Sequence, residues 1–518
     1  MSGGGKGLLQ STGGAVAPTV ALSLFGLIAA GGIAFDYARL VGMDTELQGA
    51  ADQAALAAAG QLDGKTGACA RAARAASTLL TNNTRFANDG LGLAATVANE
   101  SACDATGNIR FFSDKAKTTA ANADANAKFV EVRVNGRTAN YALTPIVRAF
   151  SSGQINAIAF AGLANAICKV PPVMICNPFE PIGNSNINYP FDANALAGVG
   201  IKLIAGNSSA PGNFGFLETN FGSGASNLAK ALGYNSPPGD CAPVDGVTTK
   251  PGLTASVMDA LNTRFDLDTN GASTCPAGGT CSPSANVRKD LIKGNSCGTS
   301  GNQGWQESPN PYRPATAAPL SSNYPDIMGH PRDLCHAISN DLSDSVAAGC
   351  TTGGGRVGNG QWDRNAYFSV NYGWNSSQWQ AQTGLSPNAT RYQVYNWELA
   401  NPTISNMDQP IGGKDGYSYP VCRGSGITPG GTNVDRRRIS AAVVNCQAAG
   451  VNGATSNVSV LKWVDLFLVE PSYQRRRGNT VVTEASDVYV ELIGETSVGG
   501  SGSTAAQVVA RSVPYLIE

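Results

Sequence analysis

A run of about twenty apolar residues near the N-terminus is followed, with no turn between them, by an alanine-rich stretch of mixed polarity. Residues 15–35, AVAPTVALSLFGLIAAGGIAF, carry no charge, and a helix needs about 20 apolar residues to cross the hydrocarbon core of a bilayer. We therefore predict a single membrane span here. A cleaved secretory signal stays open as the alternative, because IAAGGIA offers small residues at which cleavage could occur.

The stretch that follows, at residues 36–59, has the composition of a helix. Ala, Leu, Glu and Gln, all strong helix formers, dominate it. Its apolar positions recur every three or four residues and form one narrow stripe: Tyr37, Leu40, Val41, Leu47, Ala50, Ala51, Ala54 and Ala58. We predict one continuous helix over 15–59, roughly 70 Å long at 1.5 Å per residue, with its first half in lipid and its second half projecting as a stalk.

The small side chains of the stalk allow two interpretations. Small residues let another helix approach closely, especially in membranes. On that interpretation the stalk is an interaction helix with the contact residues Leu47, Ala50, Ala51, Ala54 and Ala58. The alternative is a stalk that packs on its own domain. We expect the first, with other membrane subunits as partners.

The rest of the chain divides into three parts by its pattern. Residues 61–170 alternate apolar and polar positions after a second alanine-rich segment, which predicts a small helix-and-sheet domain with helices at 67–81 and 143–151 and strands at 109–112, 128–134 and 154–162. Residues 171–430 are loop-rich, with short helices at 226–233 and 255–266. Residues 431–518 hold near-continuous apolar runs, typical of strands covered on both faces, at 438–446, 459–471, 486–495 and 506–518.

The predicted fold class is therefore α+β. A long N-terminal transmembrane and stalk helix (1–60) precedes a loop-rich, disulfide-containing, mainly β extracytoplasmic region. We expect the C-terminal β-rich part to pack with 171–430.

Twelve cysteines, an even number, are spread over the chain. No CxxC pair occurs and there are only two histidines, so the sequence offers few suitable ligands for a zinc site. Disulfides formed in an oxidising compartment explain the cysteines better. Neighbours in sequence are the candidate pairs: Cys69–Cys103, Cys168–Cys176, Cys275–Cys281, Cys335–Cys350 and Cys422–Cys446.

The charge balance does not suggest a nucleic-acid partner. Basic and acidic residues number 36 and 37, for a net charge of −1, whereas nucleic-acid-binding domains carry clustered basic charge. The two arginine triplets, 436–438 and 475–477, are expected to be solvated strand or loop ends. The tract at 359–382 contains three Trp and two Tyr. It suggests a mini-core or, as the alternative, a carbohydrate- or protein-binding surface.

Catalytic and metal-site motifs are absent from the sequence. No G-x-S-x-G, HExxH or Walker A pattern occurs. His330 and His336 are the only histidines that could serve as a base. One Asp-x-Ser-x-Ser match exists, at Asp341, Ser343 and Ser345. It follows no apolar strand, so we expect it to be a capped helix in a disulfide loop. We expect no enzyme activity, metal or cofactor.

The N-terminal region resembles the TadG-like proteins of the Flp (tight-adherence) pilus-assembly system. In that family an apolar helix runs into a D…R…LQ.AADAAALAAA pattern. The matching residues are Asp36, Arg39, Leu47, Gln48, Ala50, Ala51, Asp52, Ala54, Ala55, Leu56, Ala57, Ala58 and Ala59. Stretches at 166–180, 211–218, 436–446 and 462–471 look similar to a branch of the family. The von Willebrand A-type domain of many larger members is not recognised here.

The resemblance implies a non-enzymatic, membrane-anchored component of pilus-assembly or secretion machinery. We expect a single-pass protein of the bacterial inner membrane with its bulk periplasmic or extracellular, because the cysteine-rich part must lie outside the cytosol. The expected partners are the lipid bilayer, other assembly subunits and, as a further candidate, a second copy of the chain. The alternative function is a cleaved, secreted binding protein or adhesin that uses the tract at 359–382.

Overall fold

A computed structural model describes residues 16–78, 84–92, 94–98, 100–147, 151–168, 173–203, 209, 213–218, 224–236, 241–243, 247–250, 255–268, 275–299, 303–405, 409–411, 413–431, 433–496 and 509–517. The chain forms two compact units. The first consists of 1–164 with 512–518, and the second of 165–511.

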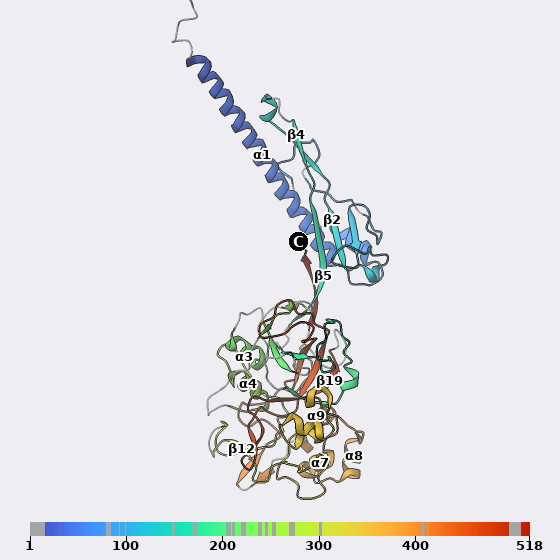
Figure 1. The fold of residues 1–518 in the computed structure, drawn as a ribbon, viewed down its shortest axis with the longest axis vertical. Helices are drawn as coiled ribbons and strands as arrows, with labels where there is room; N and C mark the ends of the chain where they lie inside the picture. The colour runs from blue at the N-terminus through green and yellow to red at the C-terminus, as the bar shows by residue number, and fades with distance from the viewer. Residues whose placement is uncertain are drawn as a thin grey trace, which may run out of the picture. The chain divides into compact units, whose positions relative to one another are not determined.

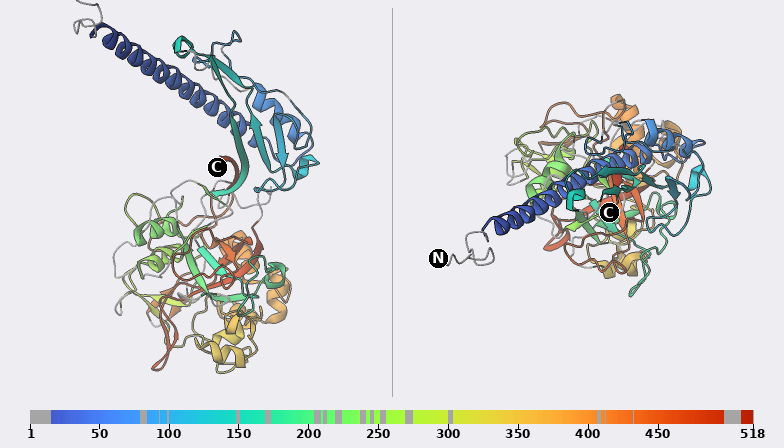
Figure 2. Two further views of the ribbon diagram at one scale, coloured as in Figure 1. Left: turned by 45° about the horizontal axis from the view of Figure 1, so that its top comes forward. Right: turned by 90° about the horizontal axis from the view of Figure 1, so that it is seen from above.

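The first unit is built around one long helix, α1 (Val16–Ala59), which confirms the predicted continuous helix. It is 44 residues long, about 66 Å at 1.5 Å per residue. Figures 1 and 2 show the N-terminal end of α1 extending beyond the sheet of the unit and its C-terminal half lying against that sheet. The other elements are α2 (Ala68–Thr78), β1 (Ile109–Phe112), η3 (Asp124–Asn126), β2 (Phe129–Arg133), β3 (Arg137–Asn140), η4 (Thr144–Val147), β4 (Ser152–Ile155), β5 (Ile158–Cys168) and β20 (Val509–Leu516).

The sheet of the first unit has the strand order β1-β2-β5-β20, and β9 (Cys241–Pro243) pairs with the C-terminal end of β5. Strands β3 and β4 form a separate hairpin that contacts α1. Helix α2 begins where the Asp124 carboxylate accepts the backbone N–H groups of Gly67 and Cys69. This is the negative charge that a helix N-terminus favours.

The second unit is organised by a seven-stranded sheet of order β10-β8-β6-β15-β16-β19-β7. Strands from the C-terminal part share this sheet with strands from before residue 251. The seven strands are β6 (Val173–Cys176), β7 (Gly200–Leu203), β8 (Phe214–Leu217), β10 (Thr249–Lys250), β15 (Arg438–Val444), β16 (Lys462–Leu468) and β19 (Val488–Glu495).

Both faces of the central strands are buried, as the apolar runs predicted. Ile439, Ala441 and Val443 of β15 belong to one core cluster, whereas Ala442 and Val444 belong to another. Because successive side chains of a strand point to opposite faces, this alternation shows a core on each side of the sheet.

Short helices and small sheets complete the second unit. The helices are α3 (Ala225–Gly233), η5 (Asn194–Leu196), α4 (Ala255–Asn262), η6 (Thr263–Phe265), α5 (Leu334–Ala337), α6 (Leu342–Ala347), η7 (Thr352–Gly355), α7 (Arg364–Tyr372), α8 (Ser376–Thr383), α9 (Arg391–Ala400) and α10 (Pro402–Ser405). The remaining strands are β11 (Leu291–Lys293), β12 (Trp305–Glu307), β13 (Gln409–Ile411), β14 (Lys414–Gly416), β17 (Arg475–Arg477) and β18 (Thr480–Thr483).

The helical stretch 364–405 was not predicted from the sequence, although it carries a recognisable signal. Asn375 with Gln378 opens α8, and Thr390 with Gln393 opens α9, each as a reciprocal capping box. The predicted helix at 143–151 is mostly wrong. η4 occupies 144–147, residues 148–150 lie outside the described part, and β4 follows.

Candidate functional site

The family-like pattern lies on α1, and its alanine face is covered by the first unit itself. Ala50, Ala51 and Ala58 have no exposed surface and Ala54 is 2% exposed. They share one core cluster with apolar residues of α2 and β2, including Ala72, Ala73, Val130 and Val132. A partner helix would have to displace these residues in order to reach the face.

In this structure residues of the same chain cover this face, so the predicted contact with another subunit would require them to move. Leu47 is also fully buried, so all five predicted contact residues belong to the core. The alternative interpretation, packing on the chain's own domain, is the one that the structure supports. The physical reason is size, because small side chains let α2 and the sheet approach α1 closely.

The polar residues of the pattern hold α1 to a neighbouring loop. The buried Asp36 carboxylate accepts the backbone N–H groups of Ala142, Leu143 and Thr144 at 3.0, 2.9 and 2.7 Å. One carboxylate thus satisfies three consecutive donors, as at a helix N-terminus.

Arg39 and Gln48 extend this attachment along α1. Arg39 donates to the carbonyls of Phe86 and Asn140 at 2.9 and 3.3 Å. Gln48 donates to the Asp52 carboxylate and to the carbonyl of Ile158. Each contact except Gln48–Asp52 joins α1 to a residue at least 47 positions away in sequence, so sequence patterns alone did not reveal them.

Two glycines of α1 mark where the loops come closest. A Cβ placed on Gly32 would lie 2.9 Å from Cβ of Leu143, and one placed on Gly42 would lie 2.9 Å from the ring of Phe86. Any larger residue at 32 or 42 would push the neighbouring loop away. Neither glycine stands out in the local sequence pattern.

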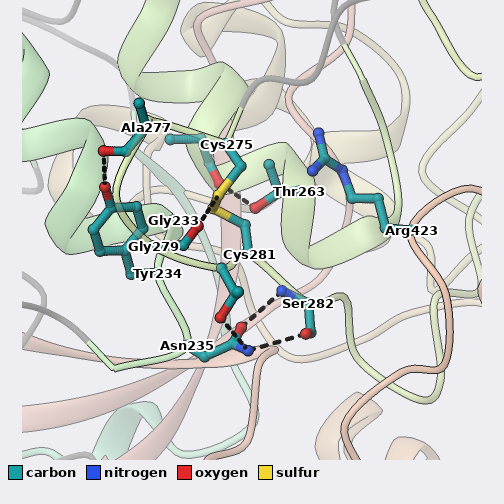
Figure 3. The surroundings of a disulfide bond; sticks show 12 residues. Gly233, Tyr234, Asn235, Thr263, Cys275, Ala277, Gly279, Cys281, Ser282 and Arg423 are labelled. Carbon is teal, nitrogen blue, oxygen red and sulfur yellow. Dashed lines mark hydrogen bonds between the residues drawn. A yellow bond between two sulfur atoms is a disulfide. The ribbon is translucent and has the colours of Figure 1, made fainter.

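The described disulfides confirm three of the predicted pairs: Cys69–Cys103, Cys275–Cys281 and Cys335–Cys350. Figure 3 shows the Cys275–Cys281 bridge, near which Tyr234 donates to the carbonyl of Ala277 and Asn235 bonds to Ser282. Each of the three bonds closes a short segment, and for such segments closeness in sequence predicts which cysteines pair.

The other two predicted pairs, Cys168–Cys176 and Cys422–Cys446, are wrong. Cys176 bonds to Cys446 and Cys297 bonds to Cys422. Parallel pairing of β6 with β15 brings Cys176 and Cys446 together across 270 residues, which no spacing rule could indicate. The backbone register of β5 and β9 pairs Cys168 with Cys241.

The Asp-x-Ser-x-Ser match is a capped helix within a disulfide loop, as expected. Asp341 caps α6 by accepting the N–H of Ser343, and the Cys335–Cys350 bond encloses it. His336 lies beside these two cysteines, but their sulfurs are already bonded to each other. This arrangement offers no thiolate to a metal.

The aromatic tract at 359–382 is a mini-core. Trp362, Tyr367, Phe368 and Trp379 are at most 3% exposed and pack together. The stacked rings of Phe368 and Trp379 lie 4.7 Å apart. These rings offer no open platform on which a sugar could stack.

The first arginine triplet is mostly buried, which corrects the expectation of solvated ends. Arg436 donates to the carbonyls of Gly233, Tyr234 and Ser282. Arg437 donates to those of Leu468 and Val469. Of the second triplet, Arg475 is buried against Asp290, whereas 476 and 477 are exposed.

Both histidines line one small cavity of ≈ 40 Å³ in the second unit, together with charged residues such as Arg332 and Glu470. That volume holds roughly three waters. The ring nitrogens of His336 contact the Tyr489 hydroxyl and the Gly355 carbonyl, both at 2.9 Å. Burial, reinforced by the charge of Lys202, lowers the pKa of His336 to about 3. Among the described residues that line this cavity there is no serine or cysteine to act as a nucleophile.

The apolar N-terminal half of α1 is its other candidate functional feature. Among the described residues, α1 is the one helix long and apolar enough to cross a membrane. Its side chains are exposed through most of 16–31, including Leu22, Leu24 and Leu27. An exposed apolar surface of this length is typical of contact with lipid.

Comparison with known families agrees with this division of α1. Residues 14–61 match the family described as putative Flp pilus-assembly TadE/G-like. No curated protein and no solved structure matches the chain. The matched residues cover the whole of α1, both its exposed apolar half and its covered alanine face. Residues 14–61 are thus similar to the TadE/G-like family of Flp pilus-assembly proteins.

Proposed function

We propose that the protein is a non-enzymatic, membrane-anchored component of Flp-type pilus-assembly or secretion machinery, with its two units outside the cytosol. The observation that carries this proposal is the coincidence of the TadE/G-like match with a helix able to span a membrane. The disulfides support the extracytoplasmic placement, because such bonds persist in oxidising compartments.

The role of α1 in this proposal is that of a rigid support. The helix runs without a break from the apolar segment into the core of the first unit, and Asp36 and Arg39 fasten the loops at the point where it enters. The first unit is therefore held close to the membrane. Continuity also supports retention of the segment, since cleavage within 28–34 would divide a continuous helix close to Gly32, where it packs against Leu143.

Other subunits would then contact α1 through its exposed half, residues 16–31, or contact the surfaces of the two units. Both histidines are buried, and both ring nitrogens of His336 are bonded within the chain, which supports a non-enzymatic role.

The test is deletion of the gene in its source bacterium, with surface pili counted by electron microscopy. Two complementing versions are compared at equal protein level. One is the full chain, and the other carries a cleavable signal in place of residues 1–35. We expect the deletion to abolish pili and only the full chain to restore them. Normal piliation of the deletion strain, or equal rescue by the secreted version, would overturn the anchored role.

A further inference from the structure

The end of the β3–β4 hairpin lies beside the apolar part of α1. Leu143, just after β3, contacts Gly32 so closely that a Cβ on this glycine would lie 2.9 Å from the Leu143 Cβ. η4, which follows Leu143, also contacts α1. Figure 1 shows the hairpin extending along α1 toward its N-terminal half.

This contact lies within the segment assigned to the membrane. Gly32 comes three residues before Phe35, the last apolar residue of the 15–35 run. At 1.5 Å per residue, Leu143 is level with a point about 4.5 Å inside that end of the span. If 16–35 cross the hydrocarbon core, the hairpin end has to enter its edge.

The hairpin end has the surface that such a position requires. Leu143 is 39% exposed although it is large and apolar, and Ala142 and Pro145 are exposed beside it. The described residues 141–147, YALTPIV, carry no charge.

The backbone N–H groups of the hairpin end also have hydrogen-bond partners within the protein, as a medium without water requires. The N–H groups of Ala142, Leu143 and Thr144 are bonded to Asp36, and that of Tyr141 is bonded to the carbonyl of Ser151. Non-helical backbone near membrane depth needs such internal partners, because lipid tails supply none. An exposed surface loop would have no need of a buried carboxylate for this purpose, since water could satisfy the same donors.

We propose that the end of the β3–β4 hairpin inserts into the near leaflet of the membrane as a second, non-spanning attachment beside α1. Its occupant is lipid, because the hairpin surface is continuous with the lipid-facing half of α1. Two attachment points fix the rotation of the first unit about the axis of α1, which a single helix would leave free. This inference rests on the proposed membrane anchor but does not depend on pilus partners.

The test uses tryptophan fluorescence of the full chain in liposomes, with and without lipids brominated on their acyl chains. Leu143→Trp and Pro145→Trp probe the hairpin end. Leu27→Trp in the middle of the span is the positive control. Lys115→Trp is the aqueous control, because residue 115 lies on the loop that follows β1. The last residue of β1 pairs with the first residue of β2, so this loop is beside the start of β2. The β3–β4 hairpin instead follows the end of β2. The six native tryptophans, all between 305 and 463, give the background to subtract.

We expect brominated lipid to remove most of the added fluorescence of Leu143→Trp and Pro145→Trp, as for Leu27→Trp, and to leave that of Lys115→Trp unchanged. Two probe positions guard against misfolding of one variant. If Leu27→Trp is quenched while neither hairpin probe is, the hairpin lies in water or against a protein and the inference is overturned. If Leu27→Trp itself is unquenched, the membrane anchor is contradicted, and the insertion that rests on it falls with it.

Discussion

The two units are stabilised by different means. The first packs small side chains closely around α1, with Ala50, Ala51, Ala54 and Ala58 in its core. The second encloses its charges more completely than the first, where the side chains of the Arg137–Asp89 pair are 5% and 12% exposed. Arg391 forms ion pairs with Asp333 and Glu491, and all three side chains are at most 1% exposed. The first unit should therefore be sensitive to added volume, and the second to removal of charge and to pH.

The largest effect is expected for Arg391→Met in the second unit. This change leaves the Asp333 and Glu491 carboxylates buried without a cation, and breaking a buried pair in this way destabilises by about 3–5 kcal/mol. Tryptophan fluorescence reports the unfolding of this unit alone, because all six tryptophans lie within it. Arg476→Met, at an exposed position, is the matched control. Equal denaturation midpoints for the two variants would contradict a role for the buried charges.

A smaller loss is expected when the Cys176–Cys446 bond is removed by the double change Cys176→Ser and Cys446→Ser. Loss of a native disulfide costs about 2–5 kcal/mol in small secreted domains. The bond joins the adjacent strands β6 and β15 at the centre of the sheet. The control is the double change Cys275→Ser and Cys281→Ser, which opens a loop closed across only six residues. In urea unfolding followed by tryptophan fluorescence, the central pair should have the larger effect, and the reverse order would be inconsistent with this account.

In the first unit, Ala54→Leu should destabilise by about 1–3 kcal/mol, because methylenes added to a closely packed core force its neighbours apart. Gln53→Leu, on the exposed side of the same helix, is the control. The stability of the first unit is followed by circular dichroism, and tryptophan fluorescence should not change. Equal stability of the two variants would mean that the alanine face is not tightly packed.

The smallest effect concerns pH and falls on the second unit alone, since both histidines belong to it. Burial lowers the pKa of His330 and His336 well below the usual value, so they stay neutral when folded while the unfolded chain binds protons near pH 6.5. The histidine contribution to stability is therefore complete above that pH and is lost as the pH is lowered through it. The loss should be about 1 kcal/mol between pH 7 and pH 6.

Hydrogen exchange, corrected for its intrinsic pH dependence, measures this loss separately in each unit. The first unit should not change, because the Asp89 carboxylate paired with Arg137 keeps a lowered pKa and stays ionised throughout. A loss of similar size in both units would contradict the assignment to the histidines.

The contrast between the two units also explains which features could be predicted from the sequence. The span and stalk were predictable because their signals are local: an uncharged run, helix-forming residues and a three- to four-residue spacing. The partner of the alanine face was not, because the pattern that buries a helix in its own domain equals the pattern that buries it against another chain. Only the position of α2 and the sheet decides between them.

In the second unit the missing information was long-range. Pairing of β6 with β15 determines the Cys176–Cys446 bond, and the fold around Arg391 collects carboxylates from 58 and 100 residues away. Three disulfides were predictable because the two cysteines of each are close in sequence. The burial of Arg436 and Arg437 was missed because charge in a sequence usually indicates exposure.

The central claim is that α1 and the first unit form one packed body without help from a partner. Hydrogen exchange of the purified full chain in detergent tests this directly, by comparing residues 43–59 with the strands β2 and β5. We predict that amides of 43–59 exchange as slowly as those of the strands in the protein alone. Rapid exchange at 43–59, slowed only when other membrane subunits are added, would show that the alanine face belongs to a partner and would contradict the account.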